Sequence, residues 1–370
     1  MIFSARTDVA YTMSFTPPLA TLRRDGNSIV IIDQTGLPWR VVERRLGTLD
    51  DVLEAIVALR VRGAPLIGVA AAHGLALALE RDASDAALED AIARLLSTRP
   101  TAVNLRLALE AQRAVLAPLP PSERPAAAWR EAERQRADDA QRCEAIGRAG
   151  LPWIEELACR LDRPVRVLTH CNAGWAATCG AGTALSPLYL AHAAGIALEV
   201  FVSETRPRNQ GLITHWELTQ AGVPATLIAD NAAGLLIAQG DIDLVLVGAD
   251  RIARNGDVAN KIGTYLKALA AHAHGVPFLV AAPATTFDPT CPNGAAIPIE
   301  ERAADEVLTV AGLPPGANDP VPVRLTPLPA RVRNPAFDLT PARWITAILT
   351  ETGAWPAPLA AAKLFPEPDR

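Results

Sequence analysis

The sequence predicts an α/β protein, in which a doubly wound parallel sheet follows a smaller part with an antiparallel sheet and helices. Three observations support this fold class. After residue 164, short apolar runs alternate with helical stretches. Each run is continuously apolar, which is typical of strands that are buried on both faces. Before residue 117, β-rich runs come first and several helical stretches follow them. A chain of 370 residues is long enough for two domains.

The smaller part is predicted to begin with a hairpin. Residues 28–42 contain two β-rich runs on either side of Gln34-Thr35-Gly36, which indicates a turn. An amphipathic helix is predicted from Leu49 to about Gly63. Apolar periodicity predicts three further helices, at 66–80, 85–97 and 103–116.

The larger part is predicted to follow a proline-rich linker or hinge at residues 117–126. A polar helix from about Ala127 to Arg148 bridges to a βαβ series, which implies a parallel sheet. Its predicted strands are 165–170, 197–204, 225–230, 244–250 and 277–283. The expected division is therefore 13–126 and 127–355, with bridging helices at 127–160 and a proline-rich tail at 356–370. Met13 is an alternative start of the chain.

Composition argues against several classes of protein. The net charge of −5 argues against a nucleic-acid-binding surface. No apolar run reaches the roughly 18 residues of a membrane span, and the first residues lack the pattern of a secretory signal. The five cysteines contain no C-x-x-C pair, which argues against a disulfide scaffold or a zinc ribbon. We expect a soluble cytoplasmic protein with reduced thiols.

Titratable residues follow several predicted strands, where ligands bind in parallel sheets. Cys171 follows the first strand and is a candidate nucleophile or acid/base, although a free cysteine also packs as a small apolar residue. Asp250 ends the fourth apolar run, where burial would suit it to proton transfer; a helix cap or a partner for Arg251 is the alternative. Lys261 is one of only three lysines and is predicted at a helix start, where it would bind an anion or remain a solvated surface residue.

Two arginine-containing loops interrupt the helices of the smaller part: Arg62-Gly63-Ala64-Pro65 and a loop that begins at Arg99. Arginine in such a loop suits a phosphate group, while a solvated helix terminus is the alternative. A Gly-Ala-Gly-Thr string at 180–183 is a weak phosphate-binding signal by itself. His73 and His215 are interpreted as packed or surface residues.

Seven strings, in this order along the chain, resemble the S-methyl-5-thioribose-1-phosphate isomerase family of the methionine salvage pathway. They are RGAPLIG, TRPTAVNL, THCNAG, ETRPRNQG, DNAAG, VGADRIARNGDVANKIGTY and NPAFDLTP. The resemblance extends from about Thr21 to Gly353, and the strings are specific only in combination. The same superfamily includes regulatory subunits of a eukaryotic translation-initiation exchange factor and some ribose-phosphate isomerases.

The resemblance implies a Rossmann-like larger domain, a site between the two domains and catalytic roles for Cys171 and Asp250. It implies phosphosugar-binding roles for Arg62, Gly63, Ala64, Arg99, Gln210, Asn260 and Lys261. It also implies a homodimer formed mainly through the larger domain, whose apolar segment 184–198 needs to be covered. A small phosphosugar is the expected partner, and the implied reaction requires neither a metal nor a nicotinamide.

The implied reaction is the aldose-to-ketose isomerisation of a ribose that carries phosphate on C1. Asp250 is the expected general acid/base, and Cys171 is either a thiolate base at C2 or a stabiliser of developing charge. Both proton transfer through an enediol and direct hydride transfer fit the residues. The alternatives are an isomerase of 5-deoxyribose 1-phosphate or ribose 1,5-bisphosphate, a non-catalytic regulatory subunit, and a dehydrogenase. The dehydrogenase lacks support because no G-x-G-x-x-G follows a predicted strand.

Overall fold

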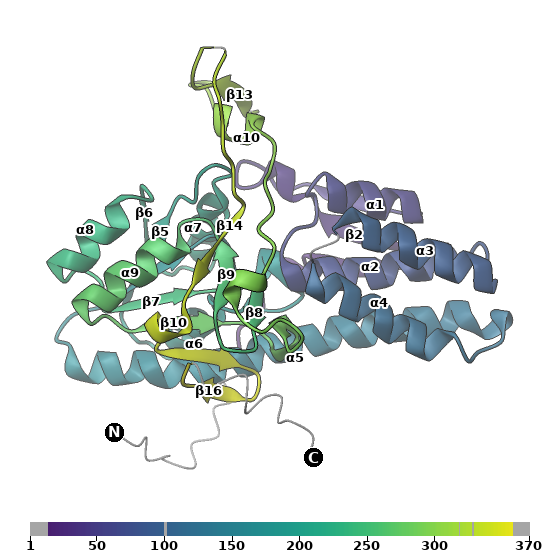
Figure 1. The fold of residues 1–370 in the computed structure, drawn as a ribbon, viewed down its shortest axis with the longest axis horizontal. Helices are drawn as coiled ribbons and strands as arrows, with labels where there is room; N and C mark the ends of the chain where they lie inside the picture. Colours follow the sequence, from purple (N-terminus) through teal and green to yellow (C-terminus); the bar gives the residue numbers. More distant parts are fainter. Residues whose placement is uncertain (1–13, 100–101, 318, 328, 358–370) are drawn as a thin grey trace.

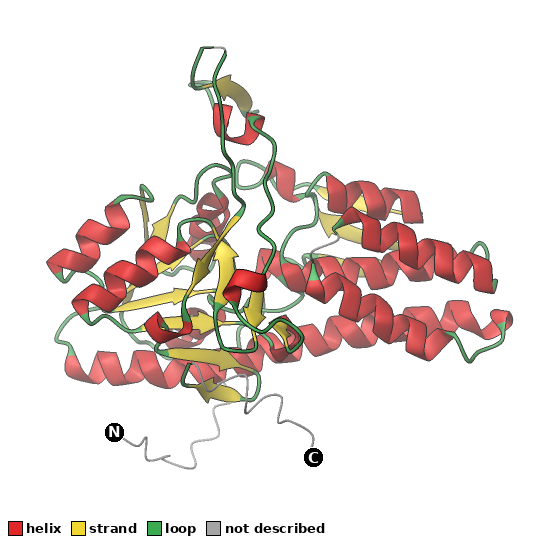
Figure 2. Ribbon diagram, in the orientation of Figure 1, coloured by secondary structure: helices red, strands yellow, loops and turns green. Residues whose placement is uncertain are grey.

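The computed structural model describes residues 14–99, 102–317, 319–327 and 329–357. Figures 1 and 2 show a mainly helical part beside a part built around a mostly parallel sheet. Met13 and most of the proline-rich tail lie outside the described residues. The predicted combination of a parallel sheet with a small antiparallel sheet is confirmed.

The smaller part begins with a three-stranded antiparallel sheet in the order β1-β2-β3. Its strands are β1 (Leu22–Asp25), β2 (Ser28–Ile32) and β3 (Glu43–Leu46). The second strand of the predicted hairpin was placed too early. The strand that follows Gln34–Gly36 begins only at Glu43. Asp33 accepts a hydrogen bond from the backbone N–H of Thr35 and closes a 3-10 turn there. Pro38 follows this turn and has no N–H to donate to a strand ladder.

Five helices pack around this sheet and beyond it: α1 (Leu49–Val57), α2 (Ala64–Leu79), α3 (Asp85–Thr98), α4 (Val103–Leu116) and α5 (Arg124–Arg160). Thr48 and Asp51 form a capping box at the start of α1. The helix ends earlier than predicted, because Leu59 adopts a left-handed conformation (φ 60°). Helix α2 is apolar all round because it lies against α1, α3, α4 and α5.

The prediction of a linker at residues 117–126 was wrong. This stretch is a short turn with one 3-10 helix (Pro121–Glu123), and it joins α4 to α5 within the helical part. Helix α5 then extends unbroken beneath both parts of the molecule (Figure 1). Trp129, near its start, belongs to the core of the helical part. Ile154, near its end, belongs to the core beneath the large sheet.

The large sheet has seven strands in the order β16-β15-β10-β7-β4-β5-β6, all parallel except β16. The strands are β4 (Val165–His170), β5 (Leu198–Ser203), β6 (Ala225–Ile228), β7 (Leu244–Val247), β10 (Phe278–Ala281), β15 (Ala347–Thr350) and β16 (Gly353–Trp355). The five predicted strands are thus confirmed, with ends that differ by at most three residues.

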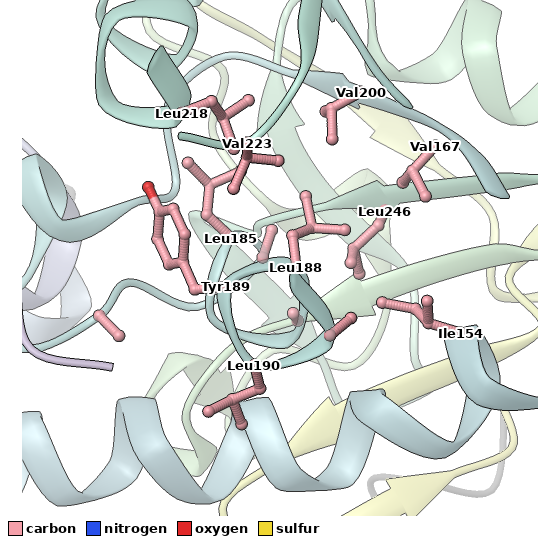
Figure 3. Close-up of a cluster of buried hydrophobic side chains, with 14 of the residues drawn as sticks. Ile154, Val167, Leu185, Leu188, Tyr189, Leu190, Val200, Leu218, Val223 and Leu246 are labelled. Atoms are coloured by element: carbon pink, nitrogen blue, oxygen red, sulfur yellow. The ribbon is translucent and has the colours of Figure 1, made fainter. Parts of the chain in front are cut away.

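Both faces of this sheet are buried, which explains the continuous apolar runs. Leu244 and Leu246 of β7 face a core shared with α5, α6 (Ser186–Ala193) and α7 (Gln210–Gln220), part of which is drawn in Figure 3. Val245 and Val247 face the opposite core, to which α8 (Ala232–Gln239) and α9 (Thr264–His274) contribute.

Several short strands lie between β7 and β15 in the sequence and were not predicted. Four of them form a second sheet in the order β11-β8-β9-β14. Their bounds are β8 (Arg251–Ala253), β9 (Val258–Lys261), β11 (Phe287–Asp288) and β14 (Phe337–Thr340). The remaining elements are a small helix, α10 (Asp305–Leu308), and a hairpin of β12 (Thr309–Gly312) and β13 (Val321–Arg324) that protrudes at the top of Figure 1. None of the described helices is long and apolar enough to cross a membrane.

Candidate active site

All of the predicted site residues line one cleft between the helical part and the carboxyl ends of the parallel strands. The helical part contributes residues at the ends of α1, α2 and α3, and the sheet part contributes those that follow β4, β5, β7 and β9. The predicted residues in this lining are Arg62, Gly63, Ala64, Arg99, Cys171, Gln210, Asp250, Asn260 and Lys261.

Cys171 lies in a strained turn immediately after β4. Its φ of 63° is left-handed, a conformation that costs free energy for any residue other than glycine. The turn is held at both ends: the backbone N–H of Cys171 donates to Thr205 Oγ1 (2.8 Å), and its carbonyl accepts from Thr214 Oγ1 (2.7 Å). The backbone at the cleft wall is therefore fixed before any ligand arrives.

The environment of Cys171 favours the protonated thiol. Burial raises the pKa of this thiol, although the positive charges of Lys261 and Arg62 oppose the shift. The negative charge of Asp250 adds to the increase. Two roles were considered for Cys171. A protonated thiol can donate a hydrogen bond to negative charge that develops on the substrate, so this role fits the cleft better than that of a thiolate base.

Asp250 follows β7 and is joined to the second sheet. Its backbone N–H donates to the carbonyl of Ala259 (2.9 Å), which fixes the backbone of Asp250 beside β9. Burial raises the pKa of the Asp250 carboxyl, while the charges of Lys261 and Arg99 oppose this change. A carboxyl group with a raised pKa is suited to exchange protons closer to neutral pH.

Arg62 enters the cleft from the helical part and is held by hydrogen bonds across the interface. Its Nε donates to Gln34 Oε1 (3.1 Å), its Nη1 donates to the carbonyl of Asn172 (3.4 Å), and its Nη2 donates to Asn172 Oδ1. Burial lowers the pKa of Arg62, and the nearby negative groups oppose this change. Gln34 and Asn172 were not predicted as site residues; Asn172 lies inside the THCNAG string, whereas nothing in the sequence indicates that Gln34 comes near it.

Gly63 allows the two parts of the chain to approach closely. It precedes α2 with φ 98°, and a Cβ at this position would lie 2.4 Å from the carbonyl oxygen of Ala177. Any larger side chain would push α2 away from the cleft. The N-terminus of α2, beginning at Ala64, borders the cleft, where it favours a negatively charged group.

Lys261 and Asn260 lie at the end of β9, so the prediction that Lys261 starts a helix was wrong. Helix α9 begins at Thr264, whose hydroxyl accepts a hydrogen bond from Asn260 Nδ2 (3.1 Å). The Lys261 ammonium group lies 4.6 Å from the centre of the Phe337 ring. This contact holds a cation at the wall of the cleft.

The last two predicted residues are Gln210, which is buried, and Arg99, which lies near an acidic side chain. Gln210 begins α7 and is buried, and its Oε1 has no hydrogen-bond partner among the described residues. Arg99 follows α3, and its Nη2 lies 3.5 Å from Glu300 Oε2. Glu300 also lines the cleft. It was not predicted, because no motif marks it.

His170 connects two walls of the cleft, although the sequence showed only that it lies at a strand end. Its Nε2 is 2.8 Å from the carbonyl oxygen of Ile262, and its Nδ1 is 3.1 Å from Ser203 Oγ. Burial and the charge of Lys267 lower the pKa of His170 to about 3, so the ring is neutral. It anchors the backbone beside Lys261 to the end of β4 and β5.

His73 and Cys179 are packed away from the cleft. His73 is fully buried, with Nδ1 2.8 Å from the carbonyl of Val69 and Nε2 2.9 Å from Glu133 Oε1. Cys179 packs against the core of the helical part. Both side chains therefore contribute to packing and not to the cleft.

Comparison with known proteins places this architecture in a family. A family model described as the initiation factor 2 subunit family matches residues 60–357. The chain belongs to the initiation factor 2 subunit family.

Solved structures similar to this chain include two that match it along nearly its whole length. One similar structure is 5-methylthioribose 1-phosphate isomerase from Pyrococcus horikoshii OT3 (TM-score 0.81, 36% identity, 97% of this chain and 99% of that one). Another is described as translation initiation factor eIF-2B, subunit delta, from A. fulgidus (TM-score 0.78, 37% identity, 94% of this chain and 99% of that one).

Several similar curated proteins are named methylthioribose-1-phosphate isomerase. A methylthioribose-1-phosphate isomerase from Dechloromonas aromatica (strain RCB) is 55% identical over 92% of this chain and 94% of that protein. Another, from Gluconobacter oxydans (strain 621H), is 53% identical over 93% and 94% respectively. The chain is thus more than 50% identical to each of these two isomerases over more than 90% of its length.

Proposed function

We propose that this chain is an aldose–ketose isomerase that converts S-methyl-5-thio-α-D-ribose 1-phosphate to S-methyl-5-thio-D-ribulose 1-phosphate in methionine salvage. The observation that carries the proposal is the meeting of a thiol, a carboxyl group and several cations in one cleft. Relatives more than 50% identical bear the name of this enzyme. A binding module would need the cations but not the half-buried pair of Cys171 and Asp250.

In this proposal the residues that line the cleft have two different tasks. Cys171 and Asp250 are catalytic residues. The phosphate group and the sugar are held by cations, amides and the backbone of the α2 N-terminus. These substrate-binding residues are Arg62, Gly63, Ala64, Arg99, Gln210, Asn260 and Lys261.

The phosphate on C1 prevents the spontaneous ring opening of a free sugar, so the enzyme must assist the break between C1 and the ring oxygen. Asp250, whose pKa is raised by burial, donates a proton to the ring oxygen. The electron pair of the broken bond leaves with the ring oxygen, so C1 becomes electron-poor. A hydride then moves from C2 to C1 while Asp250 takes the proton of the C2 hydroxyl, which leaves a ketone at C2. The thiol of Cys171 donates a hydrogen bond to the C2 oxygen, on which negative charge develops as its proton leaves.

The experiment that tests the function is turnover on three 1-phosphosugars that differ at C5. The purified protein should isomerise the methylthio sugar with the highest kcat/KM. The comparison substrates are 5-deoxyribose 1-phosphate and ribose 1,5-bisphosphate, with ketose formation measured for each. A higher kcat/KM for either comparison substrate would change the assigned substrate, and no turnover of any of them would contradict an isomerase.

Replacement of Lys261 with alanine should mainly raise KM. The phosphate group keeps its charge throughout the reaction, so a cation that binds it stabilises substrate and transition state alike. A hydrogen bond to a charged group contributes about 1.5–3 kcal/mol, which predicts an increase in KM of roughly tenfold or more. Steady-state kinetics would check this; an unchanged KM with a lower kcat would contradict the phosphate-binding role.

We further infer a Rossmann-like, doubly wound larger domain, supported by the order of the parallel strands and by helices on both faces. We propose the division 13–126 and 127–355, in which 127–160 is a bridging helical segment that contributes side chains to the cores of both parts. A cytoplasmic location is part of the same proposal.

We also infer a homodimer formed mainly through the larger domain. The expectation that segment 184–198 needs a partner to cover it was wrong, because α6 is buried in the core beneath the large sheet. Exposed apolar residues on α8 and α9, including Leu235 and Leu266, support an interface instead. Sedimentation equilibrium should give twice the monomer mass, and a monomer at working concentration would contradict the inference.

A further inference from the structure

The cleft contains an arginine to which the proposed mechanism assigns no task. Arg208 lies in the loop between β5 and α7, two residues before Gln210, and its side chain lines the cleft. We propose that Arg208 is a further substrate-binding residue, whose guanidinium group binds the phosphate together with Arg62 and Arg99. This inference rests on the proposed function for the identity of the substrate, but not for its anionic character.

The first support is that Arg208 is held in place while donors remain free. Its Nη1 donates to Glu306 Oε1 (2.9 Å), and among the described residues Glu306 is the hydrogen-bond partner that this side chain has. A guanidinium group has five N–H donors in a fixed plane. Most of them therefore remain available to a ligand in the cleft, in the bidentate geometry that suits a phosphate.

The second support is a chain of ion pairs that fixes Arg208 relative to Arg99. Glu306 also contacts Arg302 (2.7 Å), which contacts Glu300 (2.8 Å), which lies 3.5 Å from Arg99. Three of these side chains, Arg99, Glu300 and Arg302, line the cleft with Arg208. The chain thus connects the helical part to the β5–α7 loop across the mouth of the cleft, and it leaves an excess of positive charge there.

The third support is the mutual repulsion of the cations. The Arg208 side chain is 32% exposed, and its partial desolvation lowers the pKa of Arg208; Glu306 opposes this shift, and the positive charges of Arg302 and Arg99 add to it. The charge of Arg208 in turn contributes to the lowered pKa of Arg62. Like charges this close cost free energy in the empty cleft, and a doubly charged anion between them removes that cost.

The position at the start of α7 adds to the same effect. Asn209, between Arg208 and the helix, adopts a left-handed conformation (φ 57°) and turns the chain into α7. Gln210, the first residue of α7, lines the cleft, so this end of the helix borders it. The positive end of α7 and the Arg208 side chain therefore favour a negative group at the same place.

The test measures binding of inorganic phosphate by isothermal titration calorimetry, alongside steady-state kinetics with the 1-phosphosugar. Arg208→Gln should weaken phosphate binding and raise KM, each about tenfold or more, with kcat changed by only a few-fold. Arg208→Lys, which keeps the charge but loses the planar fork, should lie between wild type and Arg208→Gln. Arg254→Gln, which removes one exposed cation after β8, is the control and should match wild type in both measurements.

The outcomes separate this proposal from the proposed function. Wild-type phosphate affinity in Arg208→Gln, with a native thermal unfolding temperature, would overturn the role of Arg208 even if the isomerase activity is present. Equal weakening in Arg254→Gln would also overturn it, since the effect would then come from net charge. Weak phosphate binding in Arg208→Gln alone would support it, even if the protein turns over none of the three sugars.

Discussion

Replacement of Asp250 with asparagine should lower kcat by about 10²–10⁴, the contribution of a positioned acid/base. Asparagine has nearly the same shape, but its amide neither donates nor accepts the proton that the ring oxygen and the C2 hydroxyl exchange. The fold should be retained, because the backbone hydrogen bond from Asp250 to Ala259 does not involve the side chain. Burial already disfavours the ionised carboxylate, so its removal should not lower the free energy of unfolding.

Steady-state kinetics and thermal unfolding of the Asp250→Asn variant check this expectation. Asp162→Asn, an exposed substitution ahead of β4, is the matched control and should keep wild-type kcat. Retention of more than about a tenth of the wild-type kcat by Asp250→Asn would remove Asp250 from the catalytic role.

Replacement of Cys171 with serine should also reduce kcat by about 10² or more, with much smaller changes in phosphosugar binding. Serine fits the left-handed turn as well as cysteine does, because the turn is held by backbone hydrogen bonds to two threonines. What changes is the donor: a hydroxyl group is far less acidic and smaller than the thiol, so it stabilises the developing charge less well.

The control for this variant is Cys159→Ser, since Cys159 is an exposed cysteine near the end of α5. Single-turnover kinetics would separate the chemical step from binding. A Cys171→Ser enzyme whose main defect is a raised KM would assign the thiol to binding instead of catalysis.

The parallel strands were predictable because their surroundings impose a simple pattern. Burial on both faces of the sheet requires continuous apolar runs, and β4 was predicted to the residue for this reason. The strands β8 and β9 were not predictable in this way. They are three or four residues long and contain Arg251, Asn260 and Lys261, which resemble loop sequence until the partner strand is known.

The proline-rich stretch shows a different limit. Pro121 and Pro125 occupy the first turns of a 3-10 helix and of α5, where a missing backbone N–H costs nothing. The sequence pattern of a linker and that of a proline-started helix are the same over these residues. Only the packing of α4 and α5 against α2 distinguishes them.

The nine predicted site residues meet in one cleft, but their orientation was not predictable. Hydrogen bonds to Gln34 and Asn172 orient the Arg62 guanidinium group. Both partners are distant from Arg62 in the sequence, and Asn172 reaches it only because the helical part packs against the sheet part. Motifs identify residues that touch a ligand. They do not identify Glu300 or Glu306, whose charges act through the arginines they contact.

The unbroken helix α5 has a consequence for how this protein can be divided. Its first turns supply Ala127, Ala128 and Trp129 to the core of the helical part, although the sequence boundary falls just before them. A fragment that ends at residue 126 would expose an apolar surface where these side chains belong. Fusions, truncations and exchanges of halves between relatives should therefore keep α5 with both parts, because this one helix contributes side chains to both cores.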